Sequence, residues 1–136
     1  ISLPISDSWG VLMPEDSVLS SQEYIFPTDL YNVPLIVPSR SELQMQLSAW
    51  LQKDLSLLQI SASYNLIHTA SLSVRNNLGY ALVLNKLIYT EQEQGLVFRP
   101  LIPSMEEKLC IAWKKYQTFS KAAELYKDKL TSMLTK

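Results

Sequence analysis

The sequence has little of what several classes of protein require. Its 136 residues include 1 cysteine and 1 histidine, which excludes a disulfide framework and leaves no cluster of zinc ligands. With only 3 glycines, the chain has no glycine-rich loop for binding phosphate. No apolar run approaches the ~18 residues that cross a membrane. We therefore expect no metal, no other cofactor and no membrane partner.

What the sequence does contain is typical of a folded domain. Hydrophobic residues make up 47% of the chain, too many for a disordered segment, and the formal net charge is −1. Acidic residues predominate in residues 1–60 and lysines in residues 108–136. Because the lysine-rich segment has no arginine and no DNA-binding motif, we interpret it as the solvated face of a helix rather than a nucleic-acid patch.

Short apolar runs alternate with helical patterns along the chain. Strand-like runs occupy Val33–Val37, Leu58–Tyr64, Tyr80–Leu84, Leu96–Leu101 and Leu109–Trp113, with a polar turn predicted over Glu91–Gly95. Helical patterns with short connections separate the first three runs. The order strand, helix, strand, helix, strand predicts an α/β fold with parallel strands and right-handed crossovers.

Three helices are predicted from capping signals and apolar stripes. Ser39 and Glu42 have the spacing of a capping box at the first helix. Asn65 is the predicted N-cap of the second, which a left-handed glycine, Gly79, would end. Thr118 would cap the third. The stripes are Leu43, Leu47, Trp50 and Leu51 in the first helix, Leu66, Ile67, Ala70, Val74 and Leu78 in the second, and Phe119, Ala122, Ala123, Tyr126, Leu130, Met133 and Leu134 in the third.

Two of these helix starts are candidates for binding a ligand, because open α/β sheets bind ligands beyond the carboxyl ends of their strands. The residues concerned are Ser39, Arg40 and Ser41 at the first start and Tyr64, Asn65 and Leu66 at the second. The first offers hydroxyls, a guanidinium and free helix amides, which suit an anion such as a carboxylate. The alternative is that Ser39 and Asn65 only cap helices and that Arg40 lies in solvent.

His68 and Cys110 are the remaining residues that could serve catalysis. No serine or carboxylate stands at a fixed spacing from His68, so we interpret it as a surface or partly packed helix residue. Cys110 is opposite in phase to Leu109 and Ile111, and we expect it to behave as a small hydrophobic residue. A small α/β enzyme that uses either residue is therefore the least supported hypothesis.

Several segments, taken in order, carry a further resemblance. They are Trp9–Ser17, Asp29–Tyr31, Pro34–Arg40, Tyr64–Asn65, Leu78–Leu82 and Trp113–Tyr116 with the closing helix. In order and spacing they resemble the effector-binding (substrate-binding) domain of LysR-type transcriptional regulators, over nearly the whole chain. The sequence departs from the family at Asn85, where many members have a proline.

The resemblance implies a fold like that of type 2 periplasmic binding proteins, in which crossing strands join two α/β lobes. Residues 14–100 would form the second subdomain, one complete βαβ lobe. Residues 1–13 and 101–136 would form the crossing strands and the C-terminal part of the first subdomain, so that the other lobe is present only in part. The start of that subdomain and the DNA-binding helix-turn-helix would lie outside this incomplete fragment.

The resemblance also implies a function: a cytoplasmic bacterial regulator, not an enzyme, that acts as a homodimer or homotetramer. A small-molecule effector in the cleft between the lobes would control DNA binding through the absent N-terminal domain, and Arg40 favours an anionic effector. The implied contacts are Ser39, Arg40, Ser41, Tyr64, Asn65, Leu66 and the turn at Gly79. The alternative is a fragment of an extracytoplasmic solute-binding protein of the same fold.

Overall fold

The structure, a computed structural model, describes residues 1–88, 90 and 95–135. The predicted turn over Glu91–Gly95 therefore lies outside the described residues except at Gly95. The chain divides into two compact units. The smaller unit consists of Ile1–Asp7 with Glu107–Lys136, and the larger unit consists of Ser8–Glu106.

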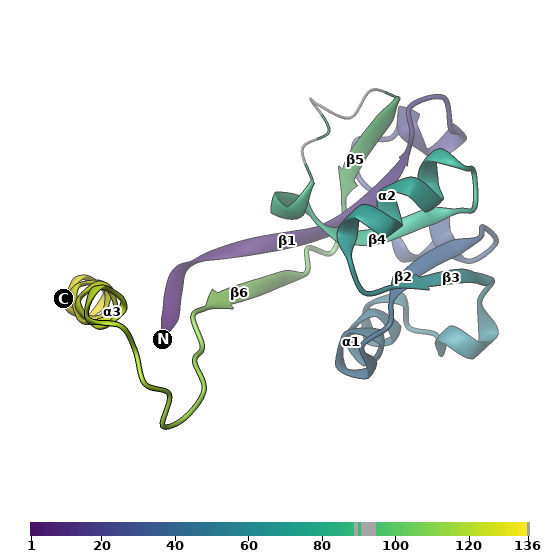
Figure 1. Cartoon of the computed structure of the whole chain (residues 1–136). Coiled ribbons are helices and arrows are strands. Elements are labelled where there is room, and N and C mark those ends of the chain that lie inside the picture. Colours follow the sequence, from purple (N-terminus) through teal and green to yellow (C-terminus); the bar gives the residue numbers. More distant parts are fainter. Residues whose placement is uncertain (89, 91–94, 136) are drawn as a thin grey trace. The chain divides into compact units, whose positions relative to one another are not determined.

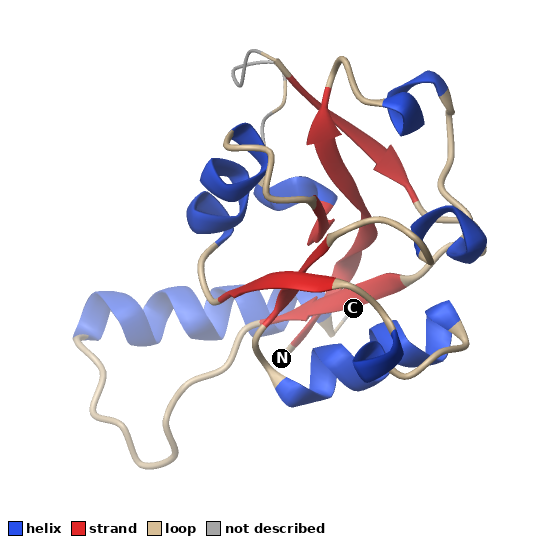
Figure 2. Cartoon of the chain, turned by 90° about the vertical axis from the view of Figure 1, so that its right-hand side faces the viewer, coloured by secondary structure: helices blue, strands red, loops and turns tan. Residues whose placement is uncertain are grey.

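Helices and strands alternate in the larger unit, as the sequence predicts. In chain order the structure contains β1 (Ser2–Pro14), β2 (Leu35–Pro38), α1 (Ser41–Leu51), β3 (Ile60–Tyr64), α2 (Ile67–Arg75), β4 (Tyr80–Leu84), β5 (Leu96–Pro100), β6 (Glu106–Cys110) and α3 (Lys121–Leu134). Short 3-10 helices are η1 (Val18–Ser21), η2 (Pro27–Leu30), η3 (Leu55–Leu57) and η4 (Asn85–Leu87). Figure 1 labels the helices and strands, and Figure 2 shows the helices in blue beside the red strands.

One mixed sheet organises these strands, in the order β3-β2-β4-β1-β5, with β6 paired to β1. β2 runs parallel to both of its neighbours, β3 and β4. β1 runs antiparallel to β4 and to β5. α1 connects β2 to β3 and α2 connects β3 to β4, which confirms the predicted α/β fold with parallel βαβ units.

The strands β1, β2 and β4 are buried on both faces of the sheet in the larger unit. Successive side chains along each of these strands point to opposite sides and enter two clusters. One cluster contains Trp9, Val11, Met13, Leu35, Val37 and Leu82 of the sheet together with Leu47 and Leu51 of α1. The other contains Leu12, Ile36, Ala81 and Val83 together with Ala70 and Val74 of α2. α1 and α2 therefore cover opposite faces of the sheet (Figure 1).

Three predicted strands begin at other residues in the structure. β3 begins at Ile60 rather than at Leu58, where its ladder with β2 starts through the pairing of Leu35 with Ile60. β2 begins at Leu35 rather than at Val33, because the preceding Pro34 has no amide hydrogen and contributes only its carbonyl oxygen, which the Tyr80 amide approaches to 2.9 Å. β6 was predicted over Leu109–Trp113 but spans Glu106–Cys110. Pairing with β1 sets the position of β6. The alternation of apolar and polar residues along the segment does not show where that pairing begins and ends.

The start and the burial of α3, in the smaller unit, both differ from the prediction. Ser120 is the N-cap, and its Oγ accepts a hydrogen bond from the Ala123 amide at 3.2 Å. Thr118, the predicted N-cap, lies two positions before Ser120 and does not cap the helix. No described residue of α3 is buried, although Leu130 and Leu134 of the predicted stripe are half-buried.

α2 is shorter than its predicted pattern. Leu66 is its N-cap and Leu78 lies beyond its end, and their side chains are 70% and 49% exposed. The left-handed residue after the helix is Asn77, with φ of 59°. The prediction that Gly79 is the left-handed glycine at the end of α2 is therefore wrong.

Gly79 is required for a different reason. It directly precedes β4 and has φ of 156°, which residues with a side chain rarely adopt. A Cβ at this position would lie 2.6 Å from the carbonyl oxygen of Pro34, on the neighbouring chain segment that leads into β2. The lack of a side chain therefore allows β2 and β4 to approach each other closely.

We predict that Gly79→Ala lowers the free energy of unfolding by about 2–4 kcal/mol, because backbone strain and a clash with Pro34 act together. Gly95→Ala is the matched control: Gly95 also has positive φ, 85°, but a Cβ there meets nothing within 4 Å. Only strain applies to that variant, so we expect a smaller loss, of about 1–2 kcal/mol. Equal losses of unfolding free energy for the two variants, measured by urea unfolding, would show that the close approach of Gly79 to Pro34 does not matter.

Candidate functional site

The two predicted ligand loops meet at one edge of the sheet. Ser39 follows the carboxyl end of β2, and Asn65 follows the carboxyl end of β3, which is its parallel neighbour. The amide of Ser39 donates to the carbonyl oxygen of Tyr64 at 2.9 Å, which joins the loops directly. The carboxyl edge, as defined here, comprises Ser39, Arg40, Ser41, Tyr64, Asn65 and Leu66. The structure thus brings all the predicted site residues together except Gly79.

Ser39 and Asn65 do not cap helices. The Oγ of Ser39 donates a hydrogen bond to Oδ1 of Asn65, so each polar side chain has the other as its partner. The N-caps are Arg40 for α1 and Leu66 for α2, and neither makes a side-chain capping bond. The predicted capping box and the predicted Asn65 cap are therefore wrong, because each helix starts one position later than the pattern indicated.

The carboxyl edge presents groups that suit an anion. The N-termini of α1 and α2 carry amides that no capping side chain occupies, and a helix N-terminus favours negative charge. Arg40 adds a guanidinium whose side chain is 73% exposed. Its Nε lies 3.9 Å from Oε2 of Glu42, which is also exposed, so the ion pair is loose and contributes little.

Tyr64 differs from its neighbours at this edge because its side chain turns inward. Its hydroxyl donates to the carbonyl oxygen of Leu82 in β4 at 2.8 Å, and its ring packs against the cluster around Ile36 and Ala70. Burial raises the pKa of the Tyr64 phenol well above its usual range. The Tyr64 hydroxyl is therefore neutral and donates its hydrogen bond within the sheet.

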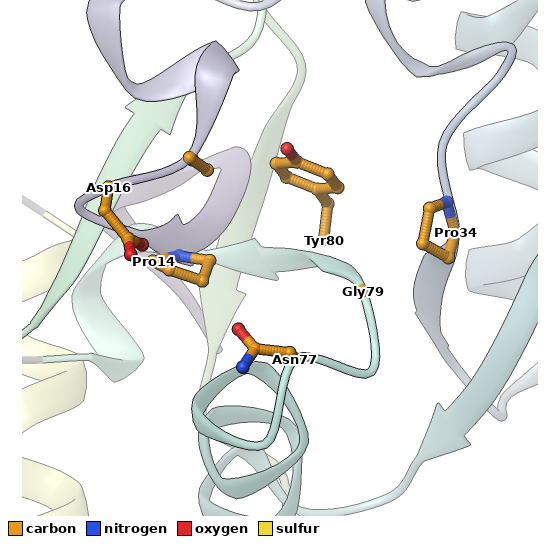
Figure 3. A pocket seen from close by; sticks show the side chains of 7 residues that line it. Pro14, Asp16, Pro34, Asn77, Gly79 and Tyr80 are labelled. Carbon is orange, nitrogen blue, oxygen red and sulfur yellow. The ribbon is translucent and has the colours of Figure 1, made fainter.

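Gly79 lies at the opposite edge of the parallel strands. Leu35 pairs with Tyr80, so the residue before Tyr80 stands at the amino ends of β2 and β4. There Gly79 borders a surface pocket of about 240 Å³, lined by Pro14, Asp16, Ser17, Pro34, Asn77, Gly79 and Tyr80 (Figure 3). The expectation that Gly79 faces the same cleft as Ser39 and Asn65 is wrong.

His68 and Cys110 lie in different units. His68 is exposed in α2 of the larger unit. Cys110 is an exposed free thiol in the smaller unit, which differs from the small hydrophobic residue that we expected. In the part of the chain that the structure describes, no group of three or more histidine, cysteine, aspartate or glutamate side chains is placed to hold a metal. Nor is any described helix long and apolar enough to cross a membrane.

A contact that supports the carboxyl edge, between Gln44 and Pro38, is not predicted from the sequence. Pro38 ends β2, and its carbonyl oxygen accepts a hydrogen bond from Nε2 of Gln44 at 2.9 Å. Gln44 lies in the first turns of α1, between the apolar positions of the stripe. Pro38 itself is readable as the end of a strand, because a proline cannot donate to a neighbouring strand, but the position of Gln44 in the sequence does not indicate the contact.

Comparison with known proteins gives one family. A model of the LysR substrate binding domain matches residues 4–134. The structure is similar to that of PA01 protein from Pseudomonas aeruginosa, a LysR family transcriptional regulator, with 21% identity and a TM-score of 0.73 over 100% of this chain and 48% of that chain. No curated protein sequence matches the chain.

Two similar structures contain a ligand. The effector binding domain of QuiR, in complex with shikimate, has 16% identity and a TM-score of 0.76 over 99% of this chain and 65% of that one. The regulatory domain of CcmR from Synechocystis PCC6803, in complex with 2-PG, has 11% identity and a TM-score of 0.71 over 98% and 66%. At these identities the likeness shows the fold alone. The chain spans between about half and two thirds of these three structures.

We predict that Ser39→Ala, Asn65→Ala and the double variant each lower the free energy of unfolding by about 1 kcal/mol. The losses do not add, because either substitution alone removes the one hydrogen bond between the two side chains. Urea unfolding measures the three values, with Ser104→Ala, an exposed serine elsewhere in the larger unit, as control. Additive losses would show that the two side chains act independently.

The raised pKa of Tyr64 predicts a loss of stability at high pH. Above its ordinary pKa of 10.0, the phenol ionises in the unfolded chain while the folded protein keeps it protonated. The unfolded state then binds fewer protons, so wild type loses up to ~1.4 kcal/mol per pH unit relative to Tyr64→Phe. Urea unfolding at several pH values from 8 to 11 measures the difference; parallel profiles for the two proteins would contradict it.

Proposed function

This chain belongs to the LysR substrate binding domain family, and from that premise we propose that it is the effector-sensing part of a transcriptional regulator. One observation carries the proposal. Ser39, Arg40 and Asn65 stand together at the carboxyl edge, where α1 and α2 begin without side-chain caps. In α/β sheets, this is the edge at which ligands bind.

The chemistry of the carboxyl edge favours a small anionic effector. Arg40 supplies an exposed positive charge, the two helix N-termini supply amides, and Ser39 and Ser41 supply hydroxyls. Such donors suit a carboxylate or a phosphate group. QuiR with shikimate and CcmR with 2-PG support the view that this fold can hold a small molecule. Leu66, 70% exposed, would add an apolar contact.

In this proposal the carboxyl edge is one wall of a cleft between two lobes. Residues 14–100 form the second subdomain, and residues 1–13 and 101–136 form the crossing strands and part of the first. The effector controls transcription by binding one arrangement of the lobes more tightly than another, which shifts their populations. We assign DNA contact to a helix-turn-helix domain outside residues 1–136, in a cytoplasmic homodimer or homotetramer that senses its effector and does not transform it.

A fragment of an extracytoplasmic solute-binding protein is the second candidate. Such a protein would share the fold and would also bind its ligand at the carboxyl edge. The family match favours the regulator, because the model that matches residues 4–134 is that of LysR domains. A helix-turn-helix upstream of this segment in the gene would exclude the solute-binding protein.

The proposal is tested by a thermal-shift screen of the whole protein that carries this chain, against carboxylic acids and phosphorylated metabolites. We expect an effector at a hundredfold excess over its Kd to stabilise the protein by about 2.7 kcal/mol. Ser39→Ala and Arg40→Gln should weaken its binding about tenfold or more, because charge-assisted hydrogen bonds to the anion are lost.

Ser104→Ala and Asn32→Ala are the matched controls, since both positions are exposed and lie outside the carboxyl edge. Binding titrations with each variant separate a loss of affinity from a loss of stability. An effector whose affinity is unchanged in Ser39→Ala and Arg40→Gln would place the site elsewhere and refute the assignment of this edge.

A further inference from the structure

The hydrogen bonding between β2 and β4 stops short of the carboxyl edge. The two strands pair at Leu35 with Tyr80 and at Ile36 with Ala81, and the ladder goes no further. The amide of Tyr80 donates to the carbonyl oxygen of Pro34 at 2.9 Å, so the main-chain groups of Tyr80 face β2. Because this orientation alternates along a strand, the carbonyl oxygen of Leu82 also faces β2.

Pro38 is the residue at which the ladder fails. In a parallel ladder that continued this register, the Leu82 carbonyl oxygen would accept from the main-chain nitrogen of residue 38. A proline there has no hydrogen to donate. An unpaired carbonyl in the buried centre of the sheet would be costly, because Leu82 is fully buried.

A side chain from the next strand supplies the missing donor. Tyr64, the last residue of β3, reaches past β2, and its hydroxyl donates to the Leu82 carbonyl oxygen at 2.8 Å. At the end of β2 itself, the Nε2 of Gln44 in α1 donates a hydrogen bond to the carbonyl oxygen of Pro38 at 2.9 Å. Two side chains therefore complete the hydrogen bonding that the main chain of β2 leaves open.

We propose that Tyr64 is a positioning residue of the carboxyl edge and not a contact for the ligand. Its hydroxyl fastens the end of β3 to β4, and its main-chain carbonyl oxygen holds the Ser39 amide at 2.9 Å. Asn65, the residue that follows, bonds the Ser39 side chain. One phenol thus sets the position of both polar side chains, and the importance of that position for an effector rests on the function proposed above.

The packing of the Tyr64 side chain favours a positioning role over direct contact with a ligand. Its ring packs against the cluster beneath α2 that contains Ile36, Ala70 and Val74. The hydroxyl is already paired with Leu82, so offering it to an effector would leave a buried carbonyl without a donor. Ser39 and Asn65, by contrast, are exposed.

A double-mutant cycle of Pro38→Ala and Tyr64→Phe tests whether the phenol replaces the missing amide. We expect Tyr64→Phe alone to lower the folding equilibrium constant about tenfold, which is typical for a lost buried hydrogen bond. In the Pro38→Ala background the new amide can donate to Leu82, and the same substitution should cost less than threefold. An equal cost in both backgrounds would overturn the proposal.

Native-state amide exchange tests the positioning role without any ligand, and so independently of whether an effector is found. Tyr64→Phe should speed exchange at Ser39, whose amide donates to the Tyr64 carbonyl oxygen, at least tenfold, while Leu12 and Val83 change only by the loss of global stability. Tyr24→Phe, which alters an exposed tyrosine of the same unit, should leave all three amides unchanged. Acceleration of all three amides to the same extent in Tyr64→Phe would show a merely structural role and overturn the proposal.

Discussion

The larger unit depends on the burial of β1 between β4 and β5 in the interior of its sheet. Alternate residues of β1 enter opposite clusters, so both faces must be covered and every main-chain group needs a partner. β4 and β5 supply the hydrogen-bond partners by pairing along the two sides of β1. α1 and α2 help to cover the two faces. Gly10 permits the pairing with β5, because a Cβ there would lie 2.6 Å from the carbonyl oxygen of Arg99 in that strand.

The fold could be predicted from the sequence because the signals for parallel strands are local and redundant. Val33–Val37 and Tyr80–Leu84 are apolar runs that suit burial on both faces, and the stripes identified the covering faces of α1 and α2. The caps could not be predicted in the same way. Ser39 has the local pattern of a capping residue, but its partner is Asn65, and the loop that brings them together is set by strand pairing.

Topology predicts that the two candidate ligand loops lie at one edge of the sheet, whereas local rules do not predict the contacts within that edge. The loops after β2 and β3 were placed correctly because loops that leave parallel strands share one edge. Gly79 enters a strand rather than leaving one, so it lies at the other edge. The bond from Tyr64 to Leu82 was not predictable, since it depends on the register of three strands. In α3, the periodicity marks an apolar face but does not say what covers it.

The partnership of Pro38 and Tyr64 has a consequence for the way this domain can diverge in evolution. A lineage that keeps proline at the end of β2 remains under selection for a hydrogen-bond donor at the end of β3. A lineage that replaces the proline regains a main-chain donor and releases the tyrosine to become phenylalanine or a smaller residue. Among related sequences the two positions should therefore covary, although 26 residues separate them along the chain and their own side chains need not touch.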